Sequence, residues 1–260
     1  MNDTRIIQLN NIKIHHCLLF LTAESGLEFF YDDKKLEIPP NSIVFIEKNM
    51  QLKVRLHCGN FPAIISLDDS TMRFIFAFFL DIFDLKHIES MPNKKVYFRN
   101  TLPEDIYLFD RLKKYVSEGV HSRRSKETMA VILPIVLHFL LEFDLNIIRS
   151  VSSIVKPTTT DRVLGIISRD LSKPWKLNMI SEEMFMSEIS LRKRLESEGT
   201  TFMNILTDAR MMYSLKLLTM SDYNINTISY KAGYNSPSYF IKTFKRHFGL
   251  TPGQIIPALQ

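Results

Sequence analysis

Hydrophobic residues in the first 67 positions form short runs that are separated by turn residues. Asp32-Asp33 and Pro39-Pro40 are two of the turn signals, because these residue types favour reversals of the chain. Seven runs are expected to be strands, at 12–14, 17–21, 27–31, 35–38, 42–46, 52–56 and 63–67. Short strands that recur about every ten residues predict an antiparallel sandwich or barrel.

Helical periodicity replaces this pattern after residue 70. The expected helices span 71–83, 103–116 and 125–146, and the last is bent near Pro134 because proline lacks a backbone N–H. Apolar stripes on these helices are expected to pack on the β domain, and a dimer interface is the alternative. The stripe residues are Leu108, Leu112, Tyr115, Val136, Leu140 and Phe143. The Phe-rich segment 74–83 is also expected in the core, with the wall of an apolar pocket as its alternative.

A Ser/Thr-rich stretch at 151–160, which also holds a proline, predicts a linker. It separates a domain of residues 1–150 from a domain of residues 161–260 in which every expected element is a helix. The expected fold class is therefore α+β, with an antiparallel β domain first and an all-α domain second.

Two related helical motifs lie in the second domain, at residues 178–198 and 225–248, and the stretch Ala232–Pro252 marks the later one most clearly. Gly233 suits a sharp corner, Ser236 is a good N-cap, and Pro237 falls in the first helical turn, where no N–H is needed. A core-facing stripe is then expected from phenylalanines spaced four residues apart, Phe240, Phe244 and Phe248. The opposite stripe contains Ser238, Ile241, Lys242 and Lys245. This arrangement is typical of a helix-turn-helix in a DNA groove, and a solvated amphipathic helix is the alternative.

The first motif, residues 178–198, has the same organisation. Ser187 is expected to cap its second helix, and Leu191 and Leu195 are expected to face inward. The outward residues are Ile189, Arg192, Lys193 and Arg194. Arginine and lysine can donate hydrogen bonds to guanine O6 and N7, and isoleucine can contact a thymine methyl group.

A helix expected over 201–220 separates the two motifs. At 1.5 Å per residue it is about 30 Å long. Successive major-groove segments on one side of B-DNA are about 34 Å apart. The spacer therefore has the length that places both second helices in adjacent segments of the groove.

The charge distribution also favours a polyanionic partner. Residues 1–150 contain 19 Lys and Arg and 19 Asp and Glu, whereas residues 161–260 contain 13 and 9. The excess positive charge is therefore concentrated in the helical domain, where the two motifs lie.

Other site chemistries are not indicated. His15-His16-Cys17 lacks a second group of ligands, and adjacent histidines in a strand point to opposite faces, so no metal is expected. Cys17 and Cys58 are expected to be reduced. The chain has only 8 glycines, and it shows neither a phosphate-binding loop nor a Ser/His/Asp arrangement. We therefore expect neither a cofactor nor an enzyme.

The N-terminus lacks the apolar core of a signal peptide. The most hydrophobic run, 129–141, is too short to span a bilayer. These two features predict a cytoplasmic protein that has no membrane partner.

Residues 161–256 resemble the AraC/XylS family of bacterial transcription regulators. The resemblance is carried by Ile228, Ala232-Gly233-Tyr234, Ser236, Ser238-Tyr239-Phe240, Phe244-Lys245, Gly249 and Thr251-Pro252. Two further stretches are similar to the Rns/ToxT-like enteric virulence activators of that family. They are Leu191-Arg192-Lys193-Arg194-Leu195-Glu196-Ser197-Glu198 and Asn10-Asn11-Ile12-Lys13-Ile14-His15.

The resemblance implies two helix-turn-helix units joined by a long helix, and a cupin-like β domain used for dimerisation and effector response. It implies double-stranded DNA and RNA polymerase as partners. The matching base-contact positions are Ile189, Arg192 and Lys193 in the first motif and Pro237, Ser238, Ile241 and Lys242 in the second. Some members of the subgroup hold a fatty acid, for which His15 is the candidate here. Ser66, and Asn224 or Asn226, stand where relatives carry Arg or Lys.

We therefore expect a sequence-specific transcription regulator, an activator of virulence-type genes in an enteric bacterium, modulated by a small effector. The alternative is a ligand-responsive sensor module that acts mainly through protein partners. Phe185 departs from the family, because a turn glycine is common at its position. Pro237 and Ile241 offer no hydrogen bonds, so the first motif is expected to read more of the DNA sequence than the second.

Overall fold

The computed structural model describes residues 6–22, 24, 26–32, 34–57, 62–83, 92, 94–118, 126–154 and 157–259. Contacts divide the chain into two compact units. One comprises Met1–Ile6 and Ile14–Lys156 and is here named the β-rich domain. The other comprises Ile7–Lys13 and Pro157–Gln260 and is named the helical domain.

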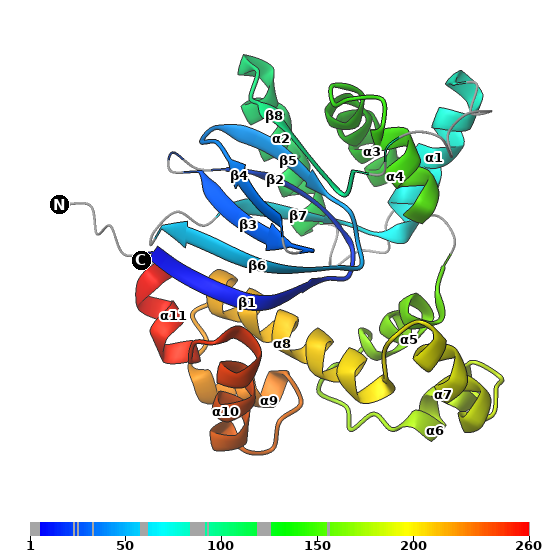
Figure 1. Cartoon of the computed structure of the whole chain (residues 1–260), viewed down its shortest axis with the longest axis vertical. Coiled ribbons are helices and arrows are strands. Elements are labelled where there is room, and N and C mark those ends of the chain that lie inside the picture. The colour runs from blue at the N-terminus through cyan, green and yellow to red at the C-terminus, as the bar shows by residue number, and fades with distance from the viewer. Residues whose placement is uncertain are drawn as a thin grey trace. The chain divides into compact units, whose positions relative to one another are not determined.

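The strands form two four-stranded sheets, in the orders β1-β6-β3-β4 and β7-β2-β5-β8 (Figure 1). The strands are β1 (Ile6–Ile14), β2 (Cys17–Leu21), β3 (Leu27–Tyr31), β4 (Lys34–Ile38), β5 (Ser42–Ile46), β6 (Met50–His57), β7 (Ala63–Leu67) and β8 (Val96–Asn100). The pairings of β2 with β5 and β7, of β3 with β4 and β6, and of β5 with β8 are antiparallel. All seven expected strands are present, which confirms the antiparallel β prediction, whereas β8 was not expected.

A row of buried side chains crosses the second sheet. Leu19 is the register partner of both Phe45 and Ile65, and Phe45 is the partner of Tyr97. All four side chains are buried on one face of the sheet, because residues that are paired in register on neighbouring strands point to the same face. This row is part of the sheet's contribution to the domain core.

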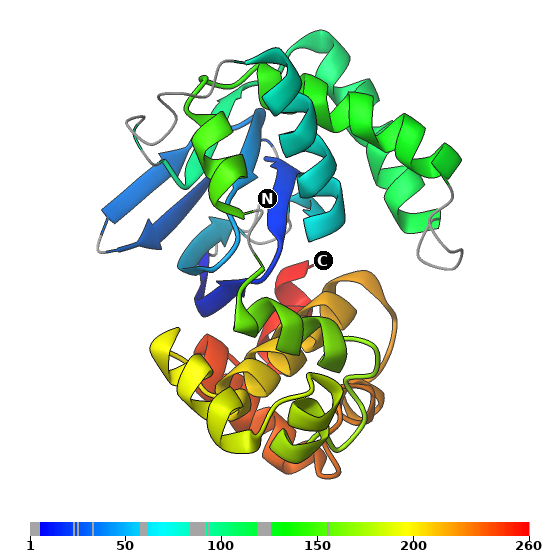
Figure 2. The same ribbon diagram turned by 90° about the vertical axis from the view of Figure 1, so that its right-hand side faces the viewer.

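Four helices complete that core: α1 (Asp69–Ile82), α2 (Pro103–Glu118), α3 (Lys126–Leu141) and α4 (Ile147–Ile154) (Figure 2). Core packing of the expected stripes is confirmed. Leu112, Val136, Leu140 and Phe143 are buried in the core, and Leu108 and Tyr115 pack against it. Phe79 is also a core residue, whereas Phe74 and Phe78 are exposed.

The helix expected over 125–146 ends at Leu141 in the structure, as α3, and a separate helix, α4, begins at Ile147. Asp144 causes the break, because its Oδ1 accepts a hydrogen bond from the backbone N–H of Asn146 at 2.7 Å. A side chain that bonds the backbone two residues ahead favours a turn. Helix α4 then continues to Ile154, into the segment expected to be a linker.

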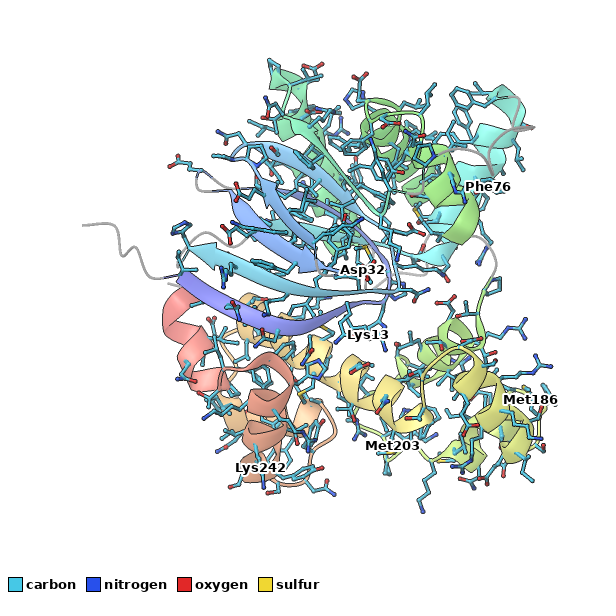
Figure 3. All side chains as sticks on the ribbon, viewed as in Figure 1. Lys13, Asp32, Phe76, Met186, Met203 and Lys242 are labelled. Atoms are coloured by element: carbon cyan, nitrogen blue, oxygen red, sulfur yellow. The ribbon has the colours of Figure 1, made fainter. Side chains whose placement is uncertain are left out.

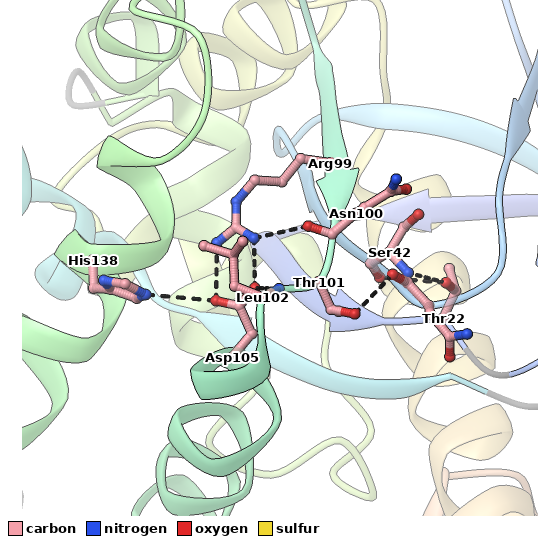
Figure 4. Close-up of polar contacts among 9 residues, drawn as sticks. Thr22, Ser42, Arg99, Asn100, Thr101, Leu102, Asp105 and His138 are labelled. Carbon is pink, nitrogen blue, oxygen red and sulfur yellow. Dashed lines mark hydrogen bonds and ion pairs between the residues drawn. The ribbon is translucent and has the colours of Figure 1, made fainter.

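The buried Asp105 forms an ion pair with the half-buried Arg99 that ties α2 to β8 (Figure 4). Its carboxylate accepts hydrogen bonds from Arg99 Nη1 at 2.5 Å and Nη2 at 2.9 Å. The backbone N–H of Leu102 donates to the same group at 2.6 Å, and His138 Nε2 lies 3.5 Å from it. Burial tends to raise the pKa of Asp105, but the bonds from Arg99 and Leu102 hold that pKa below its ordinary value.

The helical domain contains α5 (Thr159–Ile167), α6 (Leu177–Glu183), α7 (Glu188–Ser197), α8 (Phe202–Met220), α9 (Ile225–Lys231), α10 (Pro237–Phe248) and α11 (Pro252–Leu259). Figure 1 shows α8 with α5, α6 and α7 at one end and α9, α10 and α11 at the other. Helix α8 packs on α5, α9 and α11. This arrangement confirms the predicted all-α region with a long central helix.

The buried face of α8 differs from the apolar seam that the sequence pattern predicts for this helix, which consists of Phe202, Ile205, Leu206, Met212, Leu215 and Leu218. Met212 and Leu215 are half-buried, whereas Ala209, Met211 and Ser214 are buried. The reason is that α8 packs on different helices at its two ends, so its buried face rotates along its length.

Candidate nucleic-acid interface

The first motif consists of α6, a turn, and α7. Ser187 is the N-cap of α7, and its hydroxyl accepts a hydrogen bond from the backbone N–H of Ser190 at 3.2 Å. Leu191 and Leu195 are fully buried against a core that includes Ile180. These contacts fix which face of α7 points to solvent.

The outward face of α7 is cationic and partly apolar. Arg192, Lys193 and Arg194 are exposed, and Ile189 is 70% exposed. Within the described parts of the chain, these three cations form no ion pair. Their charge is therefore available to a ligand, and the structure brings together all four side chains expected there.

The second motif consists of α9, a turn, and α10. Ser236 is the N-cap of α10, and its hydroxyl accepts a hydrogen bond from the backbone N–H of Tyr239 at 3.4 Å. Pro237 lies in the first turn of the helix. Gly233 has a φ of +80°. A Cβ at this position would lie 2.5 Å from the Leu171 carbonyl oxygen, so only glycine fits.

Helix α10 has one apolar face and one exposed face. Phe240, Phe244 and Phe248 are fully buried. Ser238, Lys242, Lys245 and Arg246 are exposed, whereas Pro237 and Ile241 are half-buried. Figure 3 labels Lys242 on α10 and Met186 in the turn before α7. The two residues without hydrogen-bonding side chains are thus also the less accessible ones.

Arg210 holds the second motif, a role that the sequence pattern did not reveal. From α8, its Nε donates to the Leu171 carbonyl at 3.1 Å and its Nη2 to the Lys173 carbonyl at 2.9 Å. Its guanidinium also lies over the Tyr234 ring, 5.6 Å from the centroid. Burial lowers the pKa of Arg210. The sequence signal that could have identified this role is a charged residue, Arg210, within the apolar seam of α8.

The residues considered for an effector carboxylate have different surroundings. His15 is half-buried in the turn between β1 and β2, so the strand geometry expected for His15 and His16 does not apply. Ser66 is exposed on β7. Asn224 is the N-cap of α9, and its Oδ1 accepts from the N–H of Thr227 at 2.9 Å.

A cavity of about 600 Å³ lies in the β-rich domain, and its lining includes Tyr31, Tyr97, Arg99 and Phe143. The Phe-rich segment 74–83 contributes nothing to its lining. Among the described residues, no three His, Cys, Asp or Glu side chains are grouped as metal ligands would be. Cys17 is free, and burial raises its pKa to about 12, whereas Cys58 lies outside the described residues.

None of the helices in the described ranges is long and apolar enough to cross a membrane.

Comparison with known proteins gives a consistent picture. Residues 180–256 match the family described as "Helix-turn-helix domain". The chain is 31% identical to the HTH-type transcriptional activator CsvR of Escherichia coli over 257 residues, which is 97% of this chain and 94% of that protein. It is also 31% identical to the virulence regulon transcriptional activator VirF of Shigella flexneri over 248 residues, covering 93% and 91%.

The fold is similar to that of ToxT from Vibrio cholerae. One ToxT structure matches with a TM-score of 0.68 and 22% sequence identity, covering 100% of this chain and 96% of that one. A structure of ToxT bound to an unsaturated fatty acid matches with a TM-score of 0.66 and 17% identity, covering 98% and 92%.

Proposed function

Because the chain belongs to the AraC/XylS family of transcription regulators, in its Rns/ToxT-like group of virulence activators, we propose that it reads DNA through α7 and α10. The protein is a sequence-specific DNA-binding regulator, and its family is not one of enzymes. The observation that carries the assignment of the two helices is their shared construction. Each is capped by a serine, buried on one face, and cationic on the other.

Affinity in this proposal comes mainly from the cations. Arg192, Lys193 and Arg194 on α7, and Lys242 and Lys245 on α10, neutralise phosphates and release counterions from the duplex. Release of counterions makes binding depend steeply on salt concentration. The slope of log affinity against log salt concentration is about −0.9 for each phosphate contacted.

Specificity in this proposal comes mainly from α7. Arg192 and Lys193 donate to guanine O6 and N7, and Ile189 contacts a thymine methyl group. On α10, Ser238 and Lys242 are the hydrogen-bonding candidates, while the half-buried Pro237 and Ile241 make apolar contacts only. The second motif therefore docks and orients the protein more than it reads bases.

The length of α8 supports simultaneous binding by both motifs. Its 19 residues span about 28 Å at 1.5 Å per residue. This length is close to the separation of adjacent major-groove segments, about 34 Å. The motifs at its two ends can therefore occupy neighbouring groove segments without deformation of the spacer.

The protein in this proposal works in the cytoplasm, activates virulence-type genes of an enteric bacterium, and recruits RNA polymerase.

The protein in this proposal acts as a homodimer through α2, where Ile106 and Tyr107 are 53% and 63% exposed. The stripe first considered for dimerisation is not available, because Leu112 is buried in the core. Sedimentation analysis of Ile106→Asp tests this step, and an unchanged dimer, or a monomeric wild type, would contradict it.

A small effector such as a fatty acid regulates the protein in this proposal, as suggested by the fatty acid in one ToxT structure. His15 is the residue assigned to its carboxylate, because an imidazole N–H can donate a hydrogen bond to a carboxylate oxygen. Thermal unfolding with and without an unsaturated fatty acid, for wild type and His15→Ala, tests this assignment. An identical shift in both proteins would remove His15 from the site.

Gel-shift titration of the full chain against duplex DNA at several salt concentrations tests the central proposal. The affinity should fall steeply with salt, and binding sites mapped across a bacterial genome should share a common sequence. Absence of binding at low salt would contradict the proposal and favour a sensor that acts through protein partners.

A further inference from the structure

Phe185 has an unfavourable backbone conformation and a side chain that the protein leaves in water. It lies in the turn between α6 and α7 with a φ of +54°. Its ring is 96% exposed, more than any other large hydrophobic side chain in the described residues. A left-handed conformation is costly for a residue with a Cβ, and an exposed ring gains nothing from burial.

The corresponding turn of the second motif shows what this position requires. The N–H of Phe185 donates to the Glu182 carbonyl at 3.1 Å, as the N–H of Gly233 donates to the Tyr230 carbonyl at 2.9 Å. The next residue continues the match, because Met186 and Tyr234 donate to the residues five positions earlier, Ser181 and Ser229, at 2.9 and 3.0 Å. The two turns therefore have the same hydrogen bonding, and glycine is the inexpensive residue at this position.

Stability within the domain does not explain the phenylalanine. In the second motif the space beside Gly233 is filled by Leu171 and Arg210, whereas at Phe185 the side chain extends into solvent. Glycine at position 185 would relieve the backbone strain without the loss of any buried contact. An outlier of this kind at a binding surface indicates a functional contact.

The position of Phe185 identifies the partner of that contact. It lies two residues before Ser187, the N-cap of α7, and recognition helices approach base edges with their N-terminal residues. Ile189, one turn further on, is 70% exposed on the same helix that carries the unpaired cations Arg192 and Lys193. An apolar ring at the end of a cationic helix suits the apolar parts of a nucleotide.

We propose that Phe185 contacts DNA, packing its ring on a thymine methyl group or a deoxyribose next to the bases that α7 reads. This inference rests on the proposed function, since it requires α7 to lie in the groove. It assigns a contact outside the two recognition helices.

The test uses the full chain and the tightest-binding duplex that the wild type selects from a random-sequence library. Phe185→Gly should bind that duplex about tenfold more weakly, the size expected for the loss of a buried apolar contact. The thermal unfolding temperature of the variant should be equal to or higher than that of wild type, because the strain is relieved. Phe74→Ala, which removes a ring that is 57% exposed on α1, is the control and should not change affinity.

Replacement of single thymidines by deoxyuridine distinguishes a contact with a thymine methyl group from a contact with a deoxyribose. If wild type loses affinity at one such position and Phe185→Gly does not, the ring contacts a methyl group. If Phe185→Gly is weaker on every duplex by the same factor, the ring contacts a deoxyribose. Equal affinity of Phe185→Gly and wild type would overturn the inference, and lost activation with intact DNA binding would make Phe185 a protein contact. A wild type that selects no duplex would instead refute the proposed function.

Discussion

Glu198, just after the end of α7, accepts hydrogen bonds from Thr160, in the first turn of α5. The Thr160 N–H and hydroxyl donate to Glu198 Oε2 at 2.9 and 2.7 Å, and the Thr159 N–H donates to Oε1 at 2.7 Å. The carboxylate thereby satisfies backbone donors that have no partner inside α5, and it meets the positive end of the helix dipole. This relationship fixes α7 to the body of the helical domain, and it gives the last residue of the Leu191–Glu198 stretch a structural role.

Replacement of Glu198 should destabilise the helical domain in a pH-dependent way. Burial tends to raise the pKa of Glu198, but the bonds from Thr160 and Thr159 outweigh it and hold the pKa below its ordinary value. The contribution is therefore complete above the ordinary glutamate pKa and is lost as pH falls through the lowered one. Because Glu198 is exposed and solvent screens its charge, Glu198→Ala should cost about 0.5–1.5 kcal/mol at pH 7, measured by urea unfolding, and less near pH 3. Glu196→Gln, exposed on α7, is the control and should change little; a cost independent of pH would contradict the argument.

Three glycine-to-alanine substitutions should separate steric from conformational costs. At Gly233 the new Cβ would lie 2.5 Å from a backbone oxygen at a φ of +80°, so the cost should be about 3 kcal/mol or more. Gly199 has a φ of +72° with nothing within 4 Å, so its cost should be about 1 kcal/mol. Gly165 lies within α5 in open space, so alanine there should stabilise by about 0.5–1 kcal/mol. Equal unfolding free energies for the variants at 233 and 199 would refute the steric account.

Removal of the Asp105 charge should strongly destabilise the β-rich domain. Asp105→Asn leaves the half-buried Arg99 guanidinium without its counterion and weakens the hydrogen bonds to a buried acceptor, which should cost about 1–3 kcal/mol. Because the pKa of Asp105 is lowered, wild-type stability from this pair is present above pH 3.8 and is lost as pH falls through the lowered pKa. Chemical unfolding of the variant measures the cost. Asp110→Asn, exposed on α2, should leave stability unchanged, and a similar loss in both variants would show that the pair contributes nothing specific.

Arg192→Ala and Lys193→Ala should each weaken binding to a selected DNA site by about 1–3 kcal/mol and relax the base preference at one position. The reason is that a bidentate contact to guanine is lost while the phosphate contacts remain. Binding assays against the site and its single-base variants measure both effects. Lys113→Ala removes an exposed charge from α2 and serves as the control. Equal loss on every sequence would show that the two residues contact phosphates only.

Lys245→Ala should act differently from these two substitutions. As a phosphate contact, Lys245 should contribute equally on every sequence, and its loss should reduce the slope of log affinity against log salt by about 1. Titrations at four or more salt concentrations give this slope for wild type and variant. An unchanged slope with altered base preference would place Lys245 on a base edge instead.

Local features of the fold could be predicted because their causes lie within a few residues. The helix caps act within one helical turn, as at Ser187 and Ser236. The four-residue spacing of apolar residues acts over two or three turns, as at Phe240, Phe244 and Phe248. The seven early strands were recognisable from short apolar runs bounded by turn residues, a pattern of the same short range. The outward residues of α7 followed from the buried positions of Leu191 and Leu195.

Features that depend on distant partners could not be predicted. Strand β8 owes its place to pairing with β5, about 50 residues earlier in the chain. The break after α3 was missed because Asp144 can bond the backbone inside a pattern that is otherwise helical.

The turns at Phe185 and Gly233 show which features the sequence determined and which features the tertiary structure decided. The sequence by itself determined two helix-turn-helix motifs with serine caps, buried apolar stripes and cationic outer faces, because short-range patterns specify them. Only the tertiary structure decided that Gly233 must be glycine, since Leu171 and Arg210 occupy the space beside it. It also decided that Phe185 extends into solvent, because no distant segment among the described residues covers the same position of the first motif. Contacts between segments far apart in the chain set these demands, and no local pattern records them.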